Sequence, residues 1–99
     1  MDIRSLQKTI VENKREKGFN TTDIALEFSL LHGEVSEAFD SWRKQQDDVG
    51  EELADIAIYL LGLAELLNID VESEVDAKIA KNDTRTYRRL PNGTPVKAE

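Results

Sequence analysis

The sequence predicts an all-α fold, an antiparallel helical bundle of about four helices with a core completed by oligomerisation. Apolar residues recur at steps of three and four along four segments, and no segment shows the alternation of a strand. The connection at residues 45–50 is short, which makes the second and third helices antiparallel neighbours. The third segment is apolar around most of its circumference, and a chain of 99 residues has little else to cover it. We therefore expect a partner subunit.

Two helices are predicted in the first half of the chain, over residues 2–15 and 23–44. Asp2 is a suitable N-cap for the first helix, and Gly18 ends it before a new run of capping residues. The apolar residues of the second helix have the spacing of a packed helix pair. They are Ile24, Phe28, Leu31, Val35, Ala38 and Trp42.

Two further helices are predicted, over residues 48–67 and 70–83. The third has the same four-three spacing as the second, and the fourth is shorter and followed by basic residues. The segment 91–99 is charged and contains both prolines of the chain. It is predicted to be a flexible C-terminal tail, so that residues 1–90 form the single domain.

Charge and composition exclude several classes of function. With 20 acidic and 13 basic residues the formal charge is −7, which argues against a nucleic-acid-binding surface. The absence of cysteine excludes disulfides and thiolate metal sites. No apolar run is long enough to cross a bilayer, and none resembles a signal peptide. We expect a cytoplasmic protein without a membrane or nucleic-acid partner.

Two pairs of acidic residues carry the main indication of function. Glu34 and Glu37 lie three apart in the second helix, as Glu52 and Asp55 do in the third, so each pair points one way. If the helices pack antiparallel, the four carboxylates converge and repel unless a cation binds them. An all-oxygen ligand set suits Mg2+, with Mn2+ as a substitute, and Mg2+ held this way commonly binds substrate phosphates. The alternative is that all four are solvated surface acids.

Other side chains are weaker candidates. Lys78, Asn82 and Arg85 have a spacing that allows contact with one polyphosphate, although basic residues here also complement the end of a helix. Trp42 is a candidate for stacking on a nucleobase. Glu27 is expected to be a surface acid, with a role as an auxiliary base as the alternative.

Three motifs together resemble the MazG-like nucleoside triphosphate pyrophosphohydrolases, an all-α superfamily. They are LHGEVSEAF at residues 31–39, EELADIAIYLL at residues 51–61 and KIAKNDTRTYR at residues 78–88. The resemblance covers roughly residues 14–89. One departure is Gly33, which stands where many members carry a further Glu.

The resemblance implies Mg2+-dependent hydrolysis of (deoxy)nucleoside triphosphates to the monophosphate and pyrophosphate, as nucleotide-pool housekeeping. It implies metal binding by Glu34, Glu37, Glu52 and Asp55, with Glu34 and Glu37 sharing the metal and general-base roles. It further implies phosphate binding by Lys78, Asn82 and Arg85, closure by Tyr87, and a homodimer or homotetramer.

A different class of function stays open at this point. The bundle is alternatively a catalytically silent nucleotide- or metal-binding oligomerisation or regulatory module, which Gly33 favours, or a plain structural bundle. The preferred base and sugar, the number of metal ions and the identity of the general base are left undetermined by the sequence.

Overall fold

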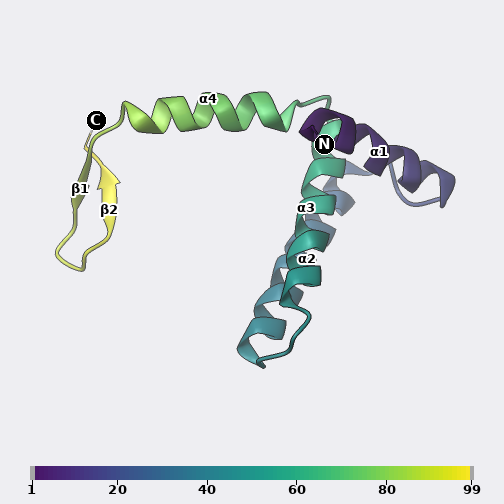
Figure 1. Ribbon diagram of the computed structural model, residues 1–99, viewed down its shortest axis with the longest axis horizontal. Helices are drawn as coiled ribbons and strands as arrows, with labels where there is room; N and C mark the ends of the chain where they lie inside the picture. The colour runs from purple at the N-terminus through teal and green to yellow at the C-terminus, as the bar shows by residue number, and fades with distance from the viewer. Residues whose placement is uncertain (1, 99) are drawn as a thin grey trace.

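The computed structural model describes residues 2–98 and contains four helices followed by a small antiparallel hairpin (Figure 1). The helices are α1 (Ile3–Glu16), α2 (Ile24–Arg43), α3 (Val49–Leu66) and α4 (Val71–Asp83), and the strands are β1 (Tyr87–Arg89) and β2 (Pro95–Lys97). The predicted all-α class is confirmed, since nearly all regular structure is helical. Each helix boundary lies within about two residues of its predicted position.

Aspartate side chains begin three of the four helices. Asp2 accepts a hydrogen bond from the backbone N–H of Ser5 at 2.7 Å, and Asp23 accepts one from that of Leu26 at 3.0 Å. Asp70 caps α4 in the same way. Each bond satisfies a backbone donor that the first turn of a helix leaves without an intrahelical partner. The predicted N-cap Asp2 is therefore confirmed.

The α2–α3 pair forms the long arm of the molecule, running downward in Figure 1. A short connection joins the helices, and Gln45 within it adopts a left-handed conformation with φ 57°. At the same end, the buried Ser41 hydroxyl donates a hydrogen bond to Asp48, the residue that precedes α3. These contacts fix the two helices as antiparallel neighbours.

Helix α1 packs against the other end of α3. Gly62 allows the close approach, because a Cβ atom there would lie 3.1 Å from Cγ2 of Ile10. Gln7 is fully buried and joins α1 to the segment between α3 and α4. Its amide nitrogen donates to the carbonyl of Ile69 at 2.7 Å, and its amide oxygen accepts from the N–H of Val71 at 3.0 Å. Gln7 thereby sets where α4 begins.

Helix α4 leaves the bundle and contacts mainly α1, with the β1–β2 hairpin at its far end (Figure 1). The Cα radius of gyration is 16.8 Å, compared with about 13 Å for a compact domain of this length. In the hairpin, Arg88 pairs with Val96. These strands were not predicted, because three residues are too few for a visible alternation. Strand β2 lies within the predicted tail, whose flexibility stays a prediction.

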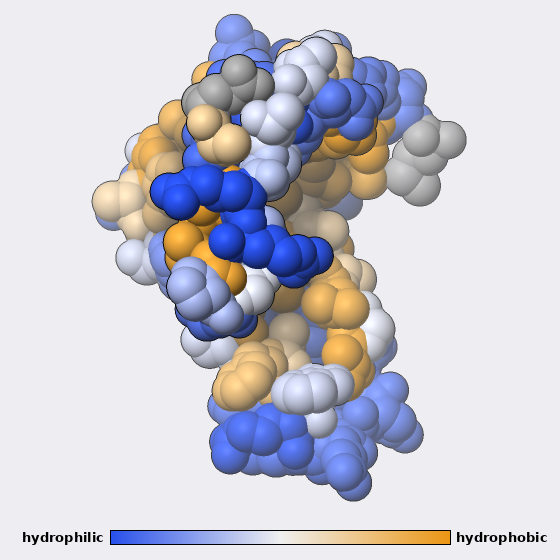
Figure 2. Space-filling view, turned by 90° about the vertical axis from the view of Figure 1, so that its left-hand side faces the viewer, coloured by the Kyte–Doolittle hydropathy of each residue, from blue (hydrophilic) through white to orange (hydrophobic). Residues whose placement is uncertain are grey.

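The core is small, and much apolar surface is exposed. The buried apolar side chains are Ile10, Val11, Ala38, Leu61, Leu63 and Ala64. Several residues of the predicted apolar seams face outward in the single chain, among them Phe28, Val35, Trp42, Leu53 and Leu60. Figure 2 shows apolar side chains at the surface of the α2–α3 arm above its hydrophilic end. Within residues 2–98, no helix has the length and apolar character needed to cross a membrane.

Candidate metal and substrate site

Three of the four predicted carboxylates meet between α2 and α3. One oxygen from each of Glu34, Glu37 and Glu52 lies within 4.8 Å of the others. Glu34 and Glu37 stand one turn apart on α2, and antiparallel pairing brings Glu52 of α3 opposite them. We call these three residues the acid cluster.

Two oxygens of the acid cluster are buried without a partner. Oε2 of Glu34 and Oε2 of Glu52 have no hydrogen-bond partner among the described residues. Burial, followed by the charges of Glu37, Asp55 and Glu52, raises the pKa of Glu34 above its ordinary value. The pKa of Glu52 is raised by burial and then mainly by Asp48 and Glu37. Buried carboxylate oxygens that lack donors and repel one another are suited to bind a cation.

Asp55 lies at the edge of the acid cluster rather than within it. It is exposed and does not belong to the group of oxygens within 4.8 Å. Its charge nevertheless contributes to the raised pKa of both Glu34 and Glu52. The residues present fit a hard divalent cation. All the candidate metal ligands are carboxylates, and two of their oxygens have no hydrogen-bond partner among the described residues.

Tyr59 is a residue near the site that the sequence reasoning missed. Its pKa is raised by burial and then by the charges of Glu34, Glu27 and Asp55. The available signal was spacing, since Asp55 and Tyr59 are four apart on α3 and thus share a face.

Glu27 was predicted to be a surface acid, and this prediction is wrong. Its side chain is 1% exposed and forms an ion pair with Lys14 of α1. The amide nitrogen of Asn20 donates a further hydrogen bond to Glu27 at 3.2 Å. The prediction failed because the partners come from α1 and the following loop, which helical periodicity within α2 does not reveal.

The predicted phosphate-binding residues gather elsewhere in the chain. The charge of Arg85, followed by burial and the charges of Lys81 and Lys97, lowers the pKa of Lys78. Asn82 accepts a hydrogen bond from Arg85 at 3.4 Å. This basic group lies on α4 and the hairpin, away from the α2–α3 arm (Figure 1). One chain thus does not bring the acidic and basic groups together.

The two aromatic candidates are exposed. Trp42 is 66% exposed and lies beside Phe39, with ring centroids 6.1 Å apart. Tyr87 is exposed on β1, at the same end of the molecule as the basic group.

The chain is similar in sequence to a family profile and to a phage enzyme. The profile of the MazG-like family matches residues 24–89. The chain is 47% identical over 47 residues to a dATP/dGTP diphosphohydrolase of Salmonella phage PMBT28. That match covers 48% of this chain and 16% of the relative, so the chain spans a small part of that protein's length.

The chain is also similar in structure to a solved protein. A cyanophage S-2L MazG-like pyrophosphohydrolase, solved with dGDP and three catalytic Mn2+ ions per active site, superposes with a TM-score of 0.81 at 26% sequence identity. The match covers all of this chain and 95% of that one. The matched residues 24–89 include the acid cluster and the basic group of α4. The chain belongs to the MazG-like family.

Proposed function

We propose that this protein is a metal-dependent pyrophosphohydrolase that converts (deoxy)nucleoside triphosphates to the monophosphate and pyrophosphate. The observation that carries the proposal is the acid cluster, in which two buried carboxylate oxygens lack any donor. A nucleotide-hydrolysing relative and a structural neighbour that holds dGDP and Mn2+ support it. A cytoplasmic role in maintaining the nucleotide pool is part of the same proposal.

The proposed cofactor is Mg2+, with Mn2+ as a substitute, held by the acid cluster with Asp55 completing the set. When bound, the ion supplies charge neutralisation for the phosphate oxygens and a more acidic water. Glu34 and Glu52 are the half-buried members of the cluster, which suits them to be ligands. Glu37 is exposed and therefore accessible to solvent.

The general base is proposed to be Glu34 or Glu37. A base must lie within hydrogen-bond reach of the water whose proton it takes. Glu37 is open to water from the solvent side of the cluster, whereas Glu34 offers a buried oxygen without a hydrogen-bond partner within residues 2–98. In either case, a carboxylate of this chain takes the proton of the water.

Phosphate binding is assigned to Lys78, Asn82 and Arg85, with Tyr87 closing the site and Trp42 beside it. Because α4 points away from its own acid cluster, we propose that a second copy of the chain supplies these groups, in a homodimer or homotetramer. The exposed apolar faces of α2 and α3 support this proposal, since large apolar patches commonly mark interfaces.

The proposal is tested by measuring pyrophosphate release from ribo-, deoxyribo- and modified nucleoside triphosphates, with Mg2+, with Mn2+ and with a chelator. The expected result is metal-dependent release that leaves the monophosphate. Release of orthophosphate instead would contradict the assigned bond. No release from any nucleotide with either metal would contradict the proposed enzyme.

A second candidate function, a silent nucleotide-binding module, is favoured by Gly33, which lacks the family's additional carboxylate. Nothing lies within 4 Å of the position a Cβ would occupy there, so the backbone has room for a side chain. Saturable nucleotide binding without product would support this second function.

A further inference from the structure

Helix α4 projects from the bundle without a buried side chain of its own. None of its residues, all of which the structure describes, is buried, and its apolar Val75 and Ile79 are 48% and 55% exposed. Figure 1 shows α4 running away from the α2–α3 arm toward the hairpin. A helix of 13 residues is marginally stable by itself and depends on packing. The direction of α4 is therefore decided at its first residues, where it meets α1.

One buried side chain, that of Gln7, connects α1 to the start of α4. Its exposed fraction is 0%. Its amide nitrogen donates to the carbonyl of Ile69 at 2.7 Å and to Glu65 at 3.3 Å, while its amide oxygen accepts from the N–H of Val71 at 3.0 Å. Val71 is the first residue of α4, and its N–H has no partner within the helix. We call these contacts the α1–α4 joint. A buried amide with its donors and acceptor all used holds one geometry.

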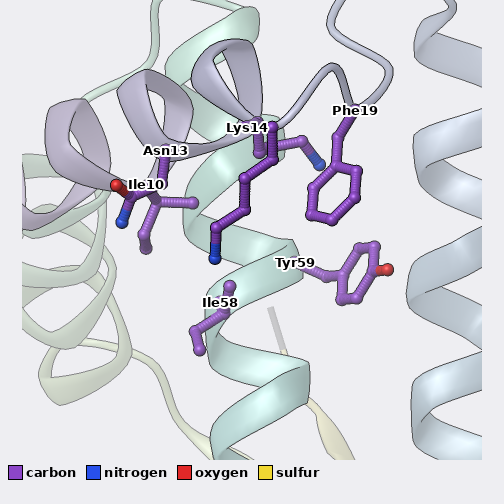
Figure 3. Close-up of a pocket in the computed structure, with 7 residues that line it drawn as sticks. Ile10, Asn13, Lys14, Phe19, Ile58 and Tyr59 are labelled. Carbon is purple, nitrogen blue, oxygen red and sulfur yellow. The ribbon is translucent and has the colours of Figure 1, made fainter.

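Helix α1 is a firm support for Gln7. Ile10 is buried and packs closely on Gly62 of α3, where a Cβ atom would lie 3.1 Å from its Cγ2. In Figure 3, Ile10 and Ile58 extend from α1 and α3 into the space between these two helices. Lys14, further along α1, forms an ion pair with α2. The α1–α4 joint therefore fixes α4 relative to the whole α2–α3 arm.

The remaining hydrogen bonds around the α1–α4 joint are exposed. The N–H of Ile3 donates to Glu72, and the guanidinium of Arg4 donates to Asn68, both at 3.3 Å. Exposed polar contacts contribute little, because water replaces them easily. Without the amide of Gln7, the carbonyl of Ile69 and the N–H of Val71 regain a partner only if the joint opens to water.

A small rotation at the α1–α4 joint has a large effect at the far end of α4. Asn82 follows Val71 by eleven residues, about 16 Å along a helix. A rotation of about 10° at the joint thus moves Asn82 by about 3 Å, as much as the whole length of a hydrogen bond. Lys78 and Arg85 move with it.

We infer that Gln7 is a positioning residue for the reaction. It fixes the direction of α4 and thereby places Lys78, Asn82 and Arg85 on the substrate phosphates, without touching the substrate itself. The inference rests on the proposed function, because that function assigns these three side chains to the phosphates.

Two variants break the α1–α4 joint from opposite sides, and a third is the control. Gln7→Leu removes the amide. Val71→Pro removes the N–H that donates to Gln7, and proline is well accepted at the first position of a helix. Val11→Ala is the control, because Val11 is 2% exposed on the same helix. Its truncation leaves a cavity and lowers stability but keeps every group of the joint.

The direction of α4 can be measured without substrate by electron resonance between two spin labels. The chain has no cysteine, so Glu12→Cys on α1 and Asp76→Cys on α4 provide two exposed labelling sites. Dilution with unlabelled chain restricts the signal to distances within one chain. We expect a narrow distribution in the wild type and in Val11→Ala, and one about twofold wider or more in both joint variants. Equal widths in all four proteins would overturn the inference.

Kinetics separate positioning from general loss of stability. Gln7→Leu is expected to raise KM for the hydrolysed nucleotide about 10-fold and to change kcat by less than about threefold, because α4 is correctly placed in only about a tenth of the molecules until substrate binds. A purely structural role would reduce the amount of active enzyme and leave KM unchanged, as expected for Val11→Ala. An unchanged KM in Gln7→Leu would overturn the positioning role.

Binding of inorganic triphosphate with Mg2+ separates failure of the inference from failure of the proposed function. Calorimetry with this probe requires neither hydrolysis nor recognition of a base. We expect Gln7→Leu to bind it about 10-fold more weakly than the wild type and Val11→Ala to bind it equally well. Equal affinity in Gln7→Leu would overturn the inference alone. Absence of pyrophosphate release from every nucleotide would overturn the proposed enzyme, while the triphosphate affinities would still decide the role of Gln7.

Discussion

Two buried carboxylate sites on the same face of α2 differ in how their charge is balanced. At one end, Glu27 is almost fully buried but receives an ion pair from Lys14 and a hydrogen bond from Asn20. Two turns further on, Glu34 faces Glu37 and Glu52, and its buried oxygen receives no hydrogen bond from the described chain. The first site is neutralised by the chain, whereas we propose that the second is neutralised by a cation from solution.

This difference separates an acid that the chain neutralises from one that we propose to bind a metal ion. A buried charge with its own partner contributes to a defined local structure, while a buried charge without one costs stability until a ligand arrives. Sequence spacing alone gives both residues the same description, because Glu27 and Glu34 lie on one face of one helix. The identity of the neighbours decides the role.

The largest expected effect comes from removing a charge at the acid cluster. Glu37→Gln or Asp55→Asn is expected to lower metal-dependent pyrophosphate release by about 10³-fold or more, since bound metal supplies several kcal/mol of transition-state stabilisation. Circular dichroism should show an unchanged helical fold. Glu12→Gln, an exposed acid on α1, is the control and retains activity. Full turnover in both variants would remove these carboxylates from the site.

The next largest effect is on the free energy of unfolding, at the ion pair of Glu27 with Lys14. Lys14→Met leaves Glu27 buried without its cation and is expected to lower the free energy of unfolding by about 3 kcal/mol, the lower end for breaking a buried pair, because Asn20 still donates to Glu27. Urea unfolding measures the change. Lys8→Met, an exposed lysine on the same helix, should change stability by less than about 0.5 kcal/mol. Equal stability of the two variants would show that the ion pair contributes nothing.

A smaller effect is the stabilisation of the protein by a metal ion bound at the acid cluster. Mg2+ or Mn2+ at 100 times its dissociation constant should raise the free energy of unfolding by about 2.7 kcal/mol. Thermal melts with and without metal test this, and Glu34→Gln should lose most of the increase. Lys14→Met should keep the increase, because this substitution acts at Glu27 and not at the acid cluster. A metal response that survives Glu34→Gln would place the ion elsewhere.

The fold was largely predictable because helical periodicity and caps are local signals. Asp2, Gly18 and the four-three spacing were sufficient for the four helices. The convergence of Glu34, Glu37 and Glu52 was also predictable, since an antiparallel hairpin brings the two motifs opposite each other. The β1–β2 hairpin was not, because its pairing joins three-residue strands.

The parts of the site that escaped prediction depend on contacts between distant segments. The pairing of Glu27 with Lys14 requires knowing how α1 packs, and no periodicity within α2 carries that information. Likewise, the position of Lys78 relative to the acid cluster depends on where α4 begins, which the buried Gln7 sets through its bonds to Ile69 and Val71. Such hydrogen bonds depend on a single side chain and leave no repeated pattern in the sequence.

The smallest expected effect is the pH dependence of the metal-free protein. The pKa values of Glu34 and Glu52 are raised in the folded state, so between the ordinary value of 4.5 and the raised values the folded state binds more protons than the unfolded state. Stability should therefore fall as the pH rises through this window, since an ionised cluster repels itself. Urea unfolding in chelator across this range measures the slope.

In Glu34→Gln the slope should shrink because one of the two groups no longer titrates, whereas Lys14→Met should leave it unchanged. Saturating Mg2+ should reverse its sign, because protons compete with the metal for the same oxygens. A metal-free slope of unchanged size in Glu34→Gln would assign the repulsion to other acids and remove the contrast between the two sites.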